Sequence, residues 1–462
     1  MQQIINDFFK ICKLQDDVVV NETTINGVTF NIVYMSQLVD IKKFNFEIKP
    51  SINSTNYKEL SKQFLGICNP ITDISEKNLD FLLYSGKVLI FFNDGYYYQF
   101  EFAEKPKRSI SESILDPEDP MASRDALIED LSDNLTLIKR RLKTNALQVR
   151  KYQLGLLNKT ECAVLFINKF YDRFSLSKVL DGLSSIKQDA ITSINDLYCL
   201  YQIDSLLPQV FNTSSPEIIT TALLRGRIVI MLDNSPIALI LPTTLSTFTT
   251  SKSYVNTPKY YSLFNHIFIT IFFLISVFFM GLFIAIISFH RGTLSISLLA
   301  NIQTTEKGTN WPTFVEVIIV YLLFEFYRFS TSRSTNNYIQ NIIIILGGLF
   351  IGQNAIQSGT IGAIILFLTS ISYIAVFAVT TNNYLITSIN IFRFFILILS
   401  FTMGLIGFIL ASIIVIFYLF KQKNNGTFYL YPFIPFDIKE LKNYFLPRKD
   451  LNQVTKLWKK FC

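Results

Sequence analysis

The chain has 462 residues, of which 50% are hydrophobic and 17% charged, and a formal net charge of +7. This hydrophobic content is high for a protein dissolved in water, and the charged content is high for one buried wholly in a membrane. Residues 334–420 carry a single charged side chain, Arg393, whereas most charges precede residue 261. The composition therefore excludes a uniform globular protein and predicts a water-soluble half followed by a membrane half.

The soluble half contains two similar stretches, residues 82–95 and 222–235. Each reads as a helix end, a glycine turn with a basic residue, a buried strand and a polar turn. Earlier strands recur in both copies, 18–20 with 30–35 and 147–149 with 163–168. The predicted fold class is α/β plus α-helical membrane, with two tandem small α/β subdomains followed by a polytopic transmembrane helical domain. Chance likeness of short strand-forming runs is the alternative.

A polar segment at 106–125, interrupted by Pro117 and Pro120, separates the two copies and leads into a charged helix at 126–143. The basic cluster at its end, residues 139–143, is interpreted as a solvated helix end that complements the helix dipole. A phosphate or lipid-headgroup contact is the alternative. The expected segments are a first cytoplasmic α/β subdomain at 1–110, a linker and charged helix at 111–146, a second cytoplasmic α/β subdomain at 147–258, a transmembrane domain at 259–422 and a basic cytoplasmic tail at 423–462.

Four apolar runs are long enough to cross about 30 Å of hydrocarbon: 263–289, 338–357, 361–380 and 393–420. A fifth run, 313–329, differs because it holds Glu316, Glu325 and Arg328. Counting it as a crossing would place the lysine-rich tail outside, against the positive-inside tendency. It is therefore expected to be interfacial or re-entrant, which leaves four crossings and both ends in the cytoplasm. The N-terminus has no basic, apolar leader pattern, so no signal peptide is expected.

Residues 347–362 combine glycines with amide and hydroxyl side chains inside the apolar half. Two of the glycines have the small-xxx-small spacing of closely packed helices, and the amides and the serine are spaced four apart on two other helix faces. Polar side chains in lipid need a neighbouring helix or water, so packing and pore lining both remain open. The pore or gate candidates are Gly348, Gly352, Gln353, Asn354, Gln357 and Ser358.

Four charged side chains of the membrane half are candidates for anchoring or gating. Glu325 and Arg328 are three residues apart and can pair on one side of a helix. Glu316 lies roughly opposite them, so it needs a different partner or solvent. Arg393 opens the last predicted span and is expected to snorkel to the membrane interface. We expect structural anchoring rather than gating for all four.

Catalytic and cofactor signatures are not recognisable in the sequence, which has no Walker loop, dinucleotide fingerprint or zinc-binding His-Glu pair. The two histidines, His266 and His290, flank the first predicted span and are expected to be interfacial. The five cysteines are widely spaced and suggest neither a disulfide framework nor a zinc site. Membrane orientation explains the basic tail better than nucleic-acid binding does. The expected protein is not an enzyme and uses no cofactor or metal.

Several runs resemble the spore germinant-receptor A-subunit family and follow its order from about residue 16 to 435. In the soluble half they are DNLTLIKRRLK at 133–143, LLPQV at 206–210 and ALLRGRIVIMLD at 222–233. In the membrane half they are SFH at 288–290, FEFYR at 324–328 and ILGGLFIGQ at 345–353. The chain departs from the family at Arg291, Asn336 and Thr360, where prolines are usual, at Asn265 and His266, where basic residues are usual, and at Tyr321, where an acidic residue is expected.

The resemblance implies a subunit that works with a transporter-like B subunit, which holds the nutrient, and a lipoprotein C subunit in the inner membrane of dormant spores. It also implies a ring of A subunits, a pentamer, around an ion path that opens on nutrient binding and releases monovalent cations to start germination. Two other hypotheses remain: a small-solute transporter that binds its solute at Gln353, Asn354 and Gln357, and a non-conducting scaffold for the other subunits. The transporter is disfavoured because the membrane half shows no internal repeat and no proline between 313 and 431.

Overall fold

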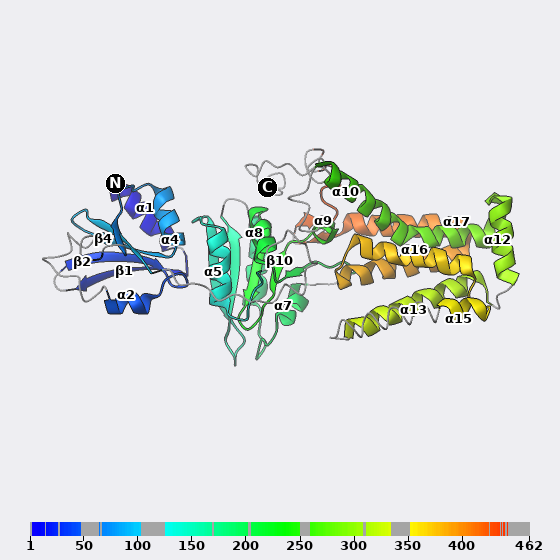
Figure 1. The fold of residues 1–462 in the computed structure, drawn as a ribbon, viewed down its shortest axis with the longest axis horizontal. Helices are drawn as coiled ribbons and strands as arrows, with labels where there is room; N and C mark the ends of the chain where they lie inside the picture. The colour runs from blue at the N-terminus through cyan, green and yellow to red at the C-terminus, as the bar shows by residue number, and fades with distance from the viewer. Residues whose placement is uncertain are drawn as a thin grey trace. The chain divides into compact units, whose positions relative to one another are not determined.

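The computed structural model describes residues 2–13, 15–25, 28–47, 64, 67–102, 125–168, 171–201, 205–249, 259–307, 311–333, 352–424, 426–434, 436, 438 and 441. The chain divides into two compact units: Met1–Ser205 with Gln209–Thr243 and Asp450–Cys462, and Leu206–Pro208 with Thr244–Lys449. The first unit contains both five-stranded sheets, and the second contains the long apolar helices (Figure 1).

The two sheets of the first unit are antiparallel and share one strand order, β1-β2-β4-β5-β3 and β6-β7-β9-β10-β8. The strands of the first sheet are β1 Val18–Ile25, β2 Val28–Met35, β3 Cys68–Pro70, β4 Lys87–Phe92 and β5 Tyr97–Glu101. Those of the second are β6 Leu147–Leu154, β7 Thr160–Ile167, β8 Phe211–Thr213, β9 Ile228–Leu232 and β10 Ala238–Leu241. The shared order confirms the predicted repeat, since the two similar stretches form matching helix–turn–strand units.

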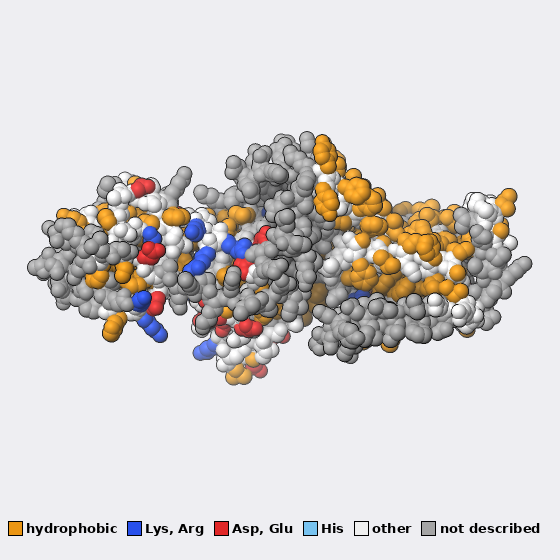
Figure 2. Space-filling model, in the orientation of Figure 1, with side chains coloured by type: hydrophobic (Ala, Val, Ile, Leu, Met, Phe, Trp, Pro, Cys, Tyr) orange, Lys and Arg blue, Asp and Glu red, His pale blue; other side chains and the backbone are white. Residues whose placement is uncertain are grey.

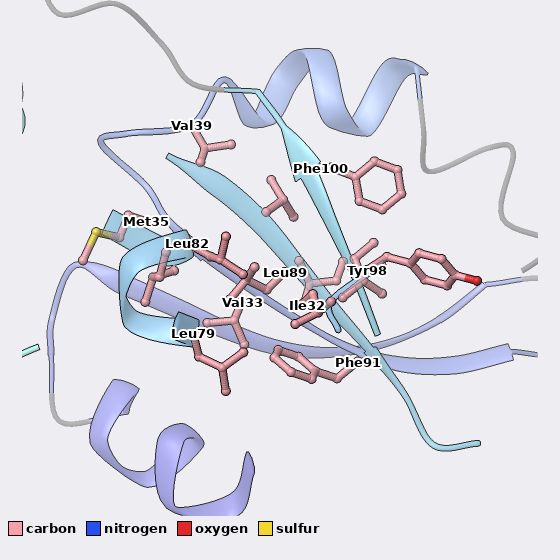
Figure 3. Close-up of a cluster of buried hydrophobic side chains, with 14 of the residues drawn as sticks. Ile32, Val33, Met35, Val39, Leu79, Leu82, Leu89, Phe91, Tyr98 and Phe100 are labelled. Carbon is pink, nitrogen blue, oxygen red and sulfur yellow. The ribbon is translucent and has the colours of Figure 1, made fainter. Parts of the chain in front are cut away.

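Both faces of the first sheet are covered by helices, which are α1 Gln2–Cys12, α2 Ile41–Glu47 and α4 Glu76–Tyr84. On one face the ring of Phe91 lies 6.3 Å from that of Phe8 in α1, and on the other Phe100 lies 5.9 Å from Phe44 in α2. Figure 3 shows Leu79 of α4 over the same core. Because both faces are buried, β4 reads as an uninterrupted apolar run instead of an alternating one.

The second sheet is also covered on both faces, by α5 Leu131–Arg141, α6 Arg173–Ser184, α7 Ile194–Tyr201 and α8 Pro216–Leu224. Alternate residues of β9 enter different cores: Ile228 and Ile230 pack with α6 and α7, and Val229 and Met231 pack with α5 and α8. Helix α5 begins at an N-cap aspartate, Asp130, whose side chain accepts hydrogen bonds from the first turn.

The outer face of α5 is not solvated as its basic end predicts. Lys139 is 1% exposed, forms an ion pair with Asp17 after the first helix, and donates to Oε1 of Gln37 at 3.0 Å. Thr136, one turn earlier, donates to the main-chain oxygen of Gln37 at 2.9 Å. Of the predicted solvated cluster, the structure exposes Arg140 and Arg141 but buries Lys139 between the two α/β subdomains.

The second unit is built from helices whose outer faces are apolar (Figure 2). They are α9 Leu245–Thr249, α10 Lys259–Leu274, the π-helical turn η4 Ile275–Phe279, α11 Met280–Phe289, the 3₁₀ turn η5 Arg291–Thr293, α12 Ile296–Lys307, α13 Thr313–Arg333, α15 Gly352–Gln357, α16 Ala363–Val379 and α17 Asn383–Lys421, followed by the short strands β11 Lys423–Asn424 and β12 Thr427–Phe428. By length and composition, two described helices could cross a membrane, Tyr260–Phe289 and Asn383–Lys421. Helix α13 packs in the same core as α11 and α16 through Val317 and Tyr321.

Helix α17 consists of two antiparallel arms that meet at Gly404. This residue has φ 63° and ψ −139°, outside the helical region. The rings of Phe392 and Tyr418 lie 5.7 Å apart, although a continuous helix would separate these positions by about 39 Å. The single span predicted at 393–420 is therefore wrong: the first arm begins at Asn383, and the chain reverses inside the apolar run.

Replacing Gly404 with alanine is expected to destabilise this hairpin by about 1–3 kcal/mol. Its φ is one that side chains rarely adopt, and the new Cβ would lie 2.8 Å from the ring of Phe289. The measurement is unfolding of the full chain in mixed micelles. Gly292→Ala is the matched control, because its Cβ meets nothing within 4 Å. Equal stability of the two variants would contradict the reversal at Gly404.

Candidate functional site

Arg393 lies at the centre of a polar network among the apolar helices. Its side chain is 1% exposed and reaches three segments. Nε donates to the main-chain oxygen of Ser276 in η4 at 2.8 Å, and one terminal nitrogen donates to that of Ser372 in α16 at 3.1 Å. The other donates to Oδ1 of Asn390, one turn earlier, at 3.0 Å. A buried guanidinium is tolerated here because each of its three nitrogens donates to an acceptor.

The π-helical turn η4 explains why Arg393 finds a carbonyl there. A π turn widens the helix and displaces its hydrogen bonds from the α-helical pattern, which leaves main-chain groups available to other partners. Ser276 lies in this turn and is buried, with its hydroxyl donating to the oxygen of Phe273 at 2.8 Å. The free main-chain oxygen of the π turn and the buried guanidinium of Arg393 therefore satisfy each other's hydrogen-bonding needs.

A second part of the network contains the pair predicted from residue spacing. Arg328 and Glu325 of α13 form an ion pair at 2.8 Å, which confirms that prediction. The other carboxylate oxygen of Glu325 accepts from the amide of Asn390 and from the hydroxyl of Tyr373, the latter at 3.3 Å. Asn390 thus joins the two parts, so that two cations and one carboxylate are linked across α13, α16 and α17.

The expectation that Arg393 snorkels to an interface is wrong. The helix begins at Asn383, where Asn382 caps it, and Arg393 follows ten residues later, about 15 Å along the axis. Tyrosine rings flank the guanidinium, with the centroids of Tyr321 and Tyr373 at 4.7 and 5.7 Å. Tyr321 occupies the position where the resemblance suggests an acidic residue. A ring face, which attracts cations, stands there instead.

Glu316 is separate from this network, nine residues before Glu325 and about 14 Å along α13. It is fully buried, and Oε2 accepts a hydrogen bond from the main-chain nitrogen of Gly362 at 2.9 Å. Gly362 is the N-cap of α16, so the carboxylate lies at the positive end of that helix dipole. The sequence predicted that Glu316 needs a partner other than Arg328 or else solvent, and the partner that the structure shows is this main-chain amide. The other carboxylate oxygen, Oε1, has no hydrogen-bond partner among the described residues.

The pore candidates fall on and beside the short helix α15. Gln353, Gln357 and Ser358 are exposed in the single chain. Gly352 begins the helix, and Ser358 lies in the turn that leads to Gly362, so the structure brings this segment close to Glu316. Gly348 lies outside the described residues, as does the side chain of Asn354, and so the proposed glycine spacing stays a prediction.

Four members of the network were not found from the sequence: Ser276, Ser372, Tyr373 and Asn390. Ser276 and Ser372 act on Arg393 through main-chain oxygens, which residue type does not reveal. Asn390 carried a usable signal, because an amide one helical turn before an arginine in an apolar run points toward the same side.

The described cysteines and the two histidines show no arrangement that points to catalysis or metal binding. Burial raises the pKa of the Cys12, Cys68 and Cys162 thiols to about 12, which makes them poor nucleophiles. His266 is buried in α10, where Nδ1 lies 2.7 Å from the oxygen of Ser262, whereas His290 is exposed after α11. Within the described ranges, His, Cys, Asp and Glu side chains form no group of three or more that could hold a metal.

These features define a class of protein in which repeated α/β subdomains precede an apolar helical unit with buried, hydrogen-bonded charges. Residues 5–457 match the family described as Bacillus/Clostridium GerA spore germination protein, and the chain belongs to that family. The resemblance drawn from the sequence motifs is thereby confirmed.

Individual relatives agree with the family. Spore germination protein XA of Bacillus anthracis is 27% identical over 421 residues, covering 88% of this chain and 84% of the relative. Spore germination protein GerQA of Bacillus cereus is 25% identical over 445 residues, covering 93% and 87%. The crystal structure of the N-terminal domain of the A subunit of the Bacillus megaterium spore germinant receptor GerK3 is a looser match, with 19% identity and a TM-score of 0.38 over 51% of this chain and 92% of that one.

Proposed function

We propose that this chain is the A subunit of a nutrient-sensing spore germinant receptor, and that copies of it enclose a nutrient-gated path for monovalent cations. The observation that carries the proposal is the exposure of Gln353, Gln357 and Ser358 on an otherwise apolar helical unit. Amides that face lipid are costly, so the side chains of Gln353 and Gln357 require water or a neighbouring copy. A ring of A subunits around a water-filled path supplies both the water and the neighbouring copy. We propose that this ring is a pentamer.

The helical unit is proposed to cross the membrane six times. The crossings are α10–α11, α13, the predicted span 338–357, α16 and the two arms of α17; residues 338–351 lie outside the described part. Only 33% and 28% of the most apolar windows of Tyr260–Phe289 and Asn383–Lys421 are buried, unlike core helices of a soluble protein. The packing of α13 among the other helices favours a span over the interfacial placement expected from its charges.

Six crossings place the basic tail, residues 423–462, on the same side as the α/β subdomains, which agrees with the positive-inside tendency. We assign that side to the spore core and the helices to the spore inner membrane. The proposed partners are a transporter-like B subunit that binds the nutrient and a lipoprotein C subunit. The A subunit itself performs no catalysis in this scheme and needs no cofactor.

Gating is proposed to begin with nutrient binding in the partner, which favours one of two packings of the A-subunit helices. The network around Arg393 links α13, α16 and α17 and so provides a discrete arrangement that can be exchanged for another. Glu316 holds the amide of Gly362 and thereby fixes the turn after the pore candidates. Dewetting of an apolar constriction beside Gln353 would close the path.

Replacing Gly352 with leucine tests the pore segment. The added side chain is expected to abolish nutrient-triggered cation release from spores, because leucine prevents the close approach of helices around the path. The measurement is monovalent-cation release together with the amount of A subunit in the membrane. Gly292→Leu serves as the control, since a Cβ there meets open space. Normal release from Gly352→Leu spores that hold wild-type amounts of the subunit would contradict the assignment.

Single-channel recording separates this function from its rivals. The purified subunit, alone and with its partner subunits, is placed in planar bilayers with and without nutrient. A channel gives discrete conductance steps that Gly352→Leu removes. Solute uptake without such steps would establish a transporter, and silence in both assays with intact assembly would establish a scaffold.

A further inference from the structure

Arg227 is a buried cation in the second α/β subdomain that belongs to no network described above. Helix α8 ends with Gly226 at φ +80°, and the main-chain nitrogens of Gly226 and Arg227 donate to the oxygens of Leu223 and Ala222, each at 3.0 Å. This is the Schellman helix ending, in which the residue after the glycine is usually apolar. The turn therefore fixes an arginine where a hydrophobic side chain is expected, directly before β9.

Arg227 is 5% exposed as a whole residue, and its side chain has no hydrogen-bond or ion-pair partner in the described part of the chain. The carbonyls of the last turn of α8 are already taken by the main-chain nitrogens of Arg225, Gly226 and Arg227. Burial, and secondly the positive charge of Arg225, lower the pKa of Arg227 to about 9. At neutral pH the group is thus a charged fork of donors with little solvent contact and no counter-charge in the described part of the chain.

The first subdomain shows how the same position is satisfied when an acceptor exists. Lys87 matches Arg227 in the repeat, and its Nζ donates to Oε1 of Gln99 at 3.0 Å. Gln99 lies opposite Leu89 in the sheet, and the matching register position in the second sheet, opposite Val229, is Ile240. The second copy thus keeps the cation of the first but has an apolar side chain in place of its acceptor.

A desolvated charge without a counter-charge is strongly unfavourable, so the missing acceptor has to come from outside the chain. We infer that the second α/β subdomain binds a small oxyanion at Arg227. Guanidinium matches the two oxygens of a carboxylate or of a phosphate in a bidentate geometry, and both are included in this chemistry. A small anion is required because so little of the side chain is accessible, which excludes a macromolecular phosphate or an acidic protein surface.

The inference is independent of ion conduction and goes beyond the proposed receptor role, because it assigns a ligand to the soluble unit. It is tested on the full chain in detergent micelles by isothermal titration with inorganic phosphate in one arm and acetate in the other, at constant ionic strength. One site per chain is expected for at least one of the two anions. The arm that gives heat identifies which oxyanion the site takes.

Arg227→Met is expected to weaken that binding at least tenfold, since the variant keeps the side-chain length without the charge-assisted donors. Arg227→Lys should bind with intermediate affinity, because the charge remains and the planar fork is lost. Lys87→Met is the matched control and should bind as wild type, as Lys87 already has Gln99. Wild type that binds neither anion, or Arg227→Met that binds as wild type while its circular dichroism is unchanged, overturns the inference.

Discussion

Arg393→Met is expected to destabilise the helical unit by about 3–5 kcal/mol. The variant removes the donors but leaves the buried carbonyls of Ser276 and Ser372 behind, each costing about 1–3 kcal/mol when unsatisfied. It also frees Asn390, which joins Arg393 to Glu325. The measurement is detergent-induced unfolding of the full chain, together with the yield of membrane-inserted subunit.

Two further variants make the Arg393 result specific. Arg393→Lys retains the charge but cannot reach three acceptors in a fork, so most of the loss should remain. Arg328→Met removes one member of the partly exposed ion pair with Glu325 and should cost about 1 kcal/mol or less. An Arg393→Met protein as stable as Arg328→Met would show that the contacts of Arg393 with η4 and α16 do not hold the helices together.

Local sequence patterns predicted the fold of the two α/β subdomains well, because its signals are short-range. The glycine turn and apolar run in residues 82–95 and 222–235 produce α4–β4 and α8–β9, and Gly86 and Gly226 both have positive φ as such turns require. The same local reasoning failed at Lys139. Its partner Asp17 is 122 residues away, and no pattern in α5 distinguishes a buried lysine from the exposed arginines that follow it.

In the helical unit, composition predicted apolar segments but not where the chain reverses. A turn in water is marked by polar residues, whereas the reversal at Gly404 lies within a run that is apolar on both sides. The start of α17 did carry a signal, since Asn382 is a good N-cap, and using it would have placed Arg393 inside the helix. The network itself depends on main-chain oxygens and on three-dimensional packing, which the spacing of residues does not encode.

Lys139→Met is expected to lower the stability of the first unit by about 3–5 kcal/mol, because Asp17, 2% exposed, would be left as an unpaired buried carboxylate. The measurement is hydrogen exchange of the full chain. Protection of the amides in β1 and α5 should fall a hundredfold or more, since about 1.4 kcal/mol corresponds to a factor of ten. Protection that stays at the wild-type level would mean that Lys139 contributes nothing across the two subdomains.

The double variant Asp17→Leu with Lys139→Met separates the ion pair from the rest of the contact. Replacing both partners by apolar side chains removes the two buried charges together, and the stability is expected to return close to that of wild type. The exposed pair Lys10 and Asp7 is the control, and its double replacement should leave hydrogen exchange unchanged.

Recovery of stability in the double variant would also show whether the charges of Asp17 and Lys139 are needed for stability or for the geometry of the contact between the subdomains. Each sheet already has its own closed apolar core, so neither subdomain needs the pair in order to fold. Gln37 binds both Lys139 and Thr136, and Gln15 donates to the main-chain oxygen of Asn145, so the contact between subdomains is directional and hydrogen-bonded. Apolar replacements of Asp17 and Lys139 can restore the stability but cannot restore the directional hydrogen bond that Lys139 makes between the subdomains. Protease cleavage between the subdomains in a stable double variant, at sites protected in wild type, would therefore assign the buried pair to docking geometry.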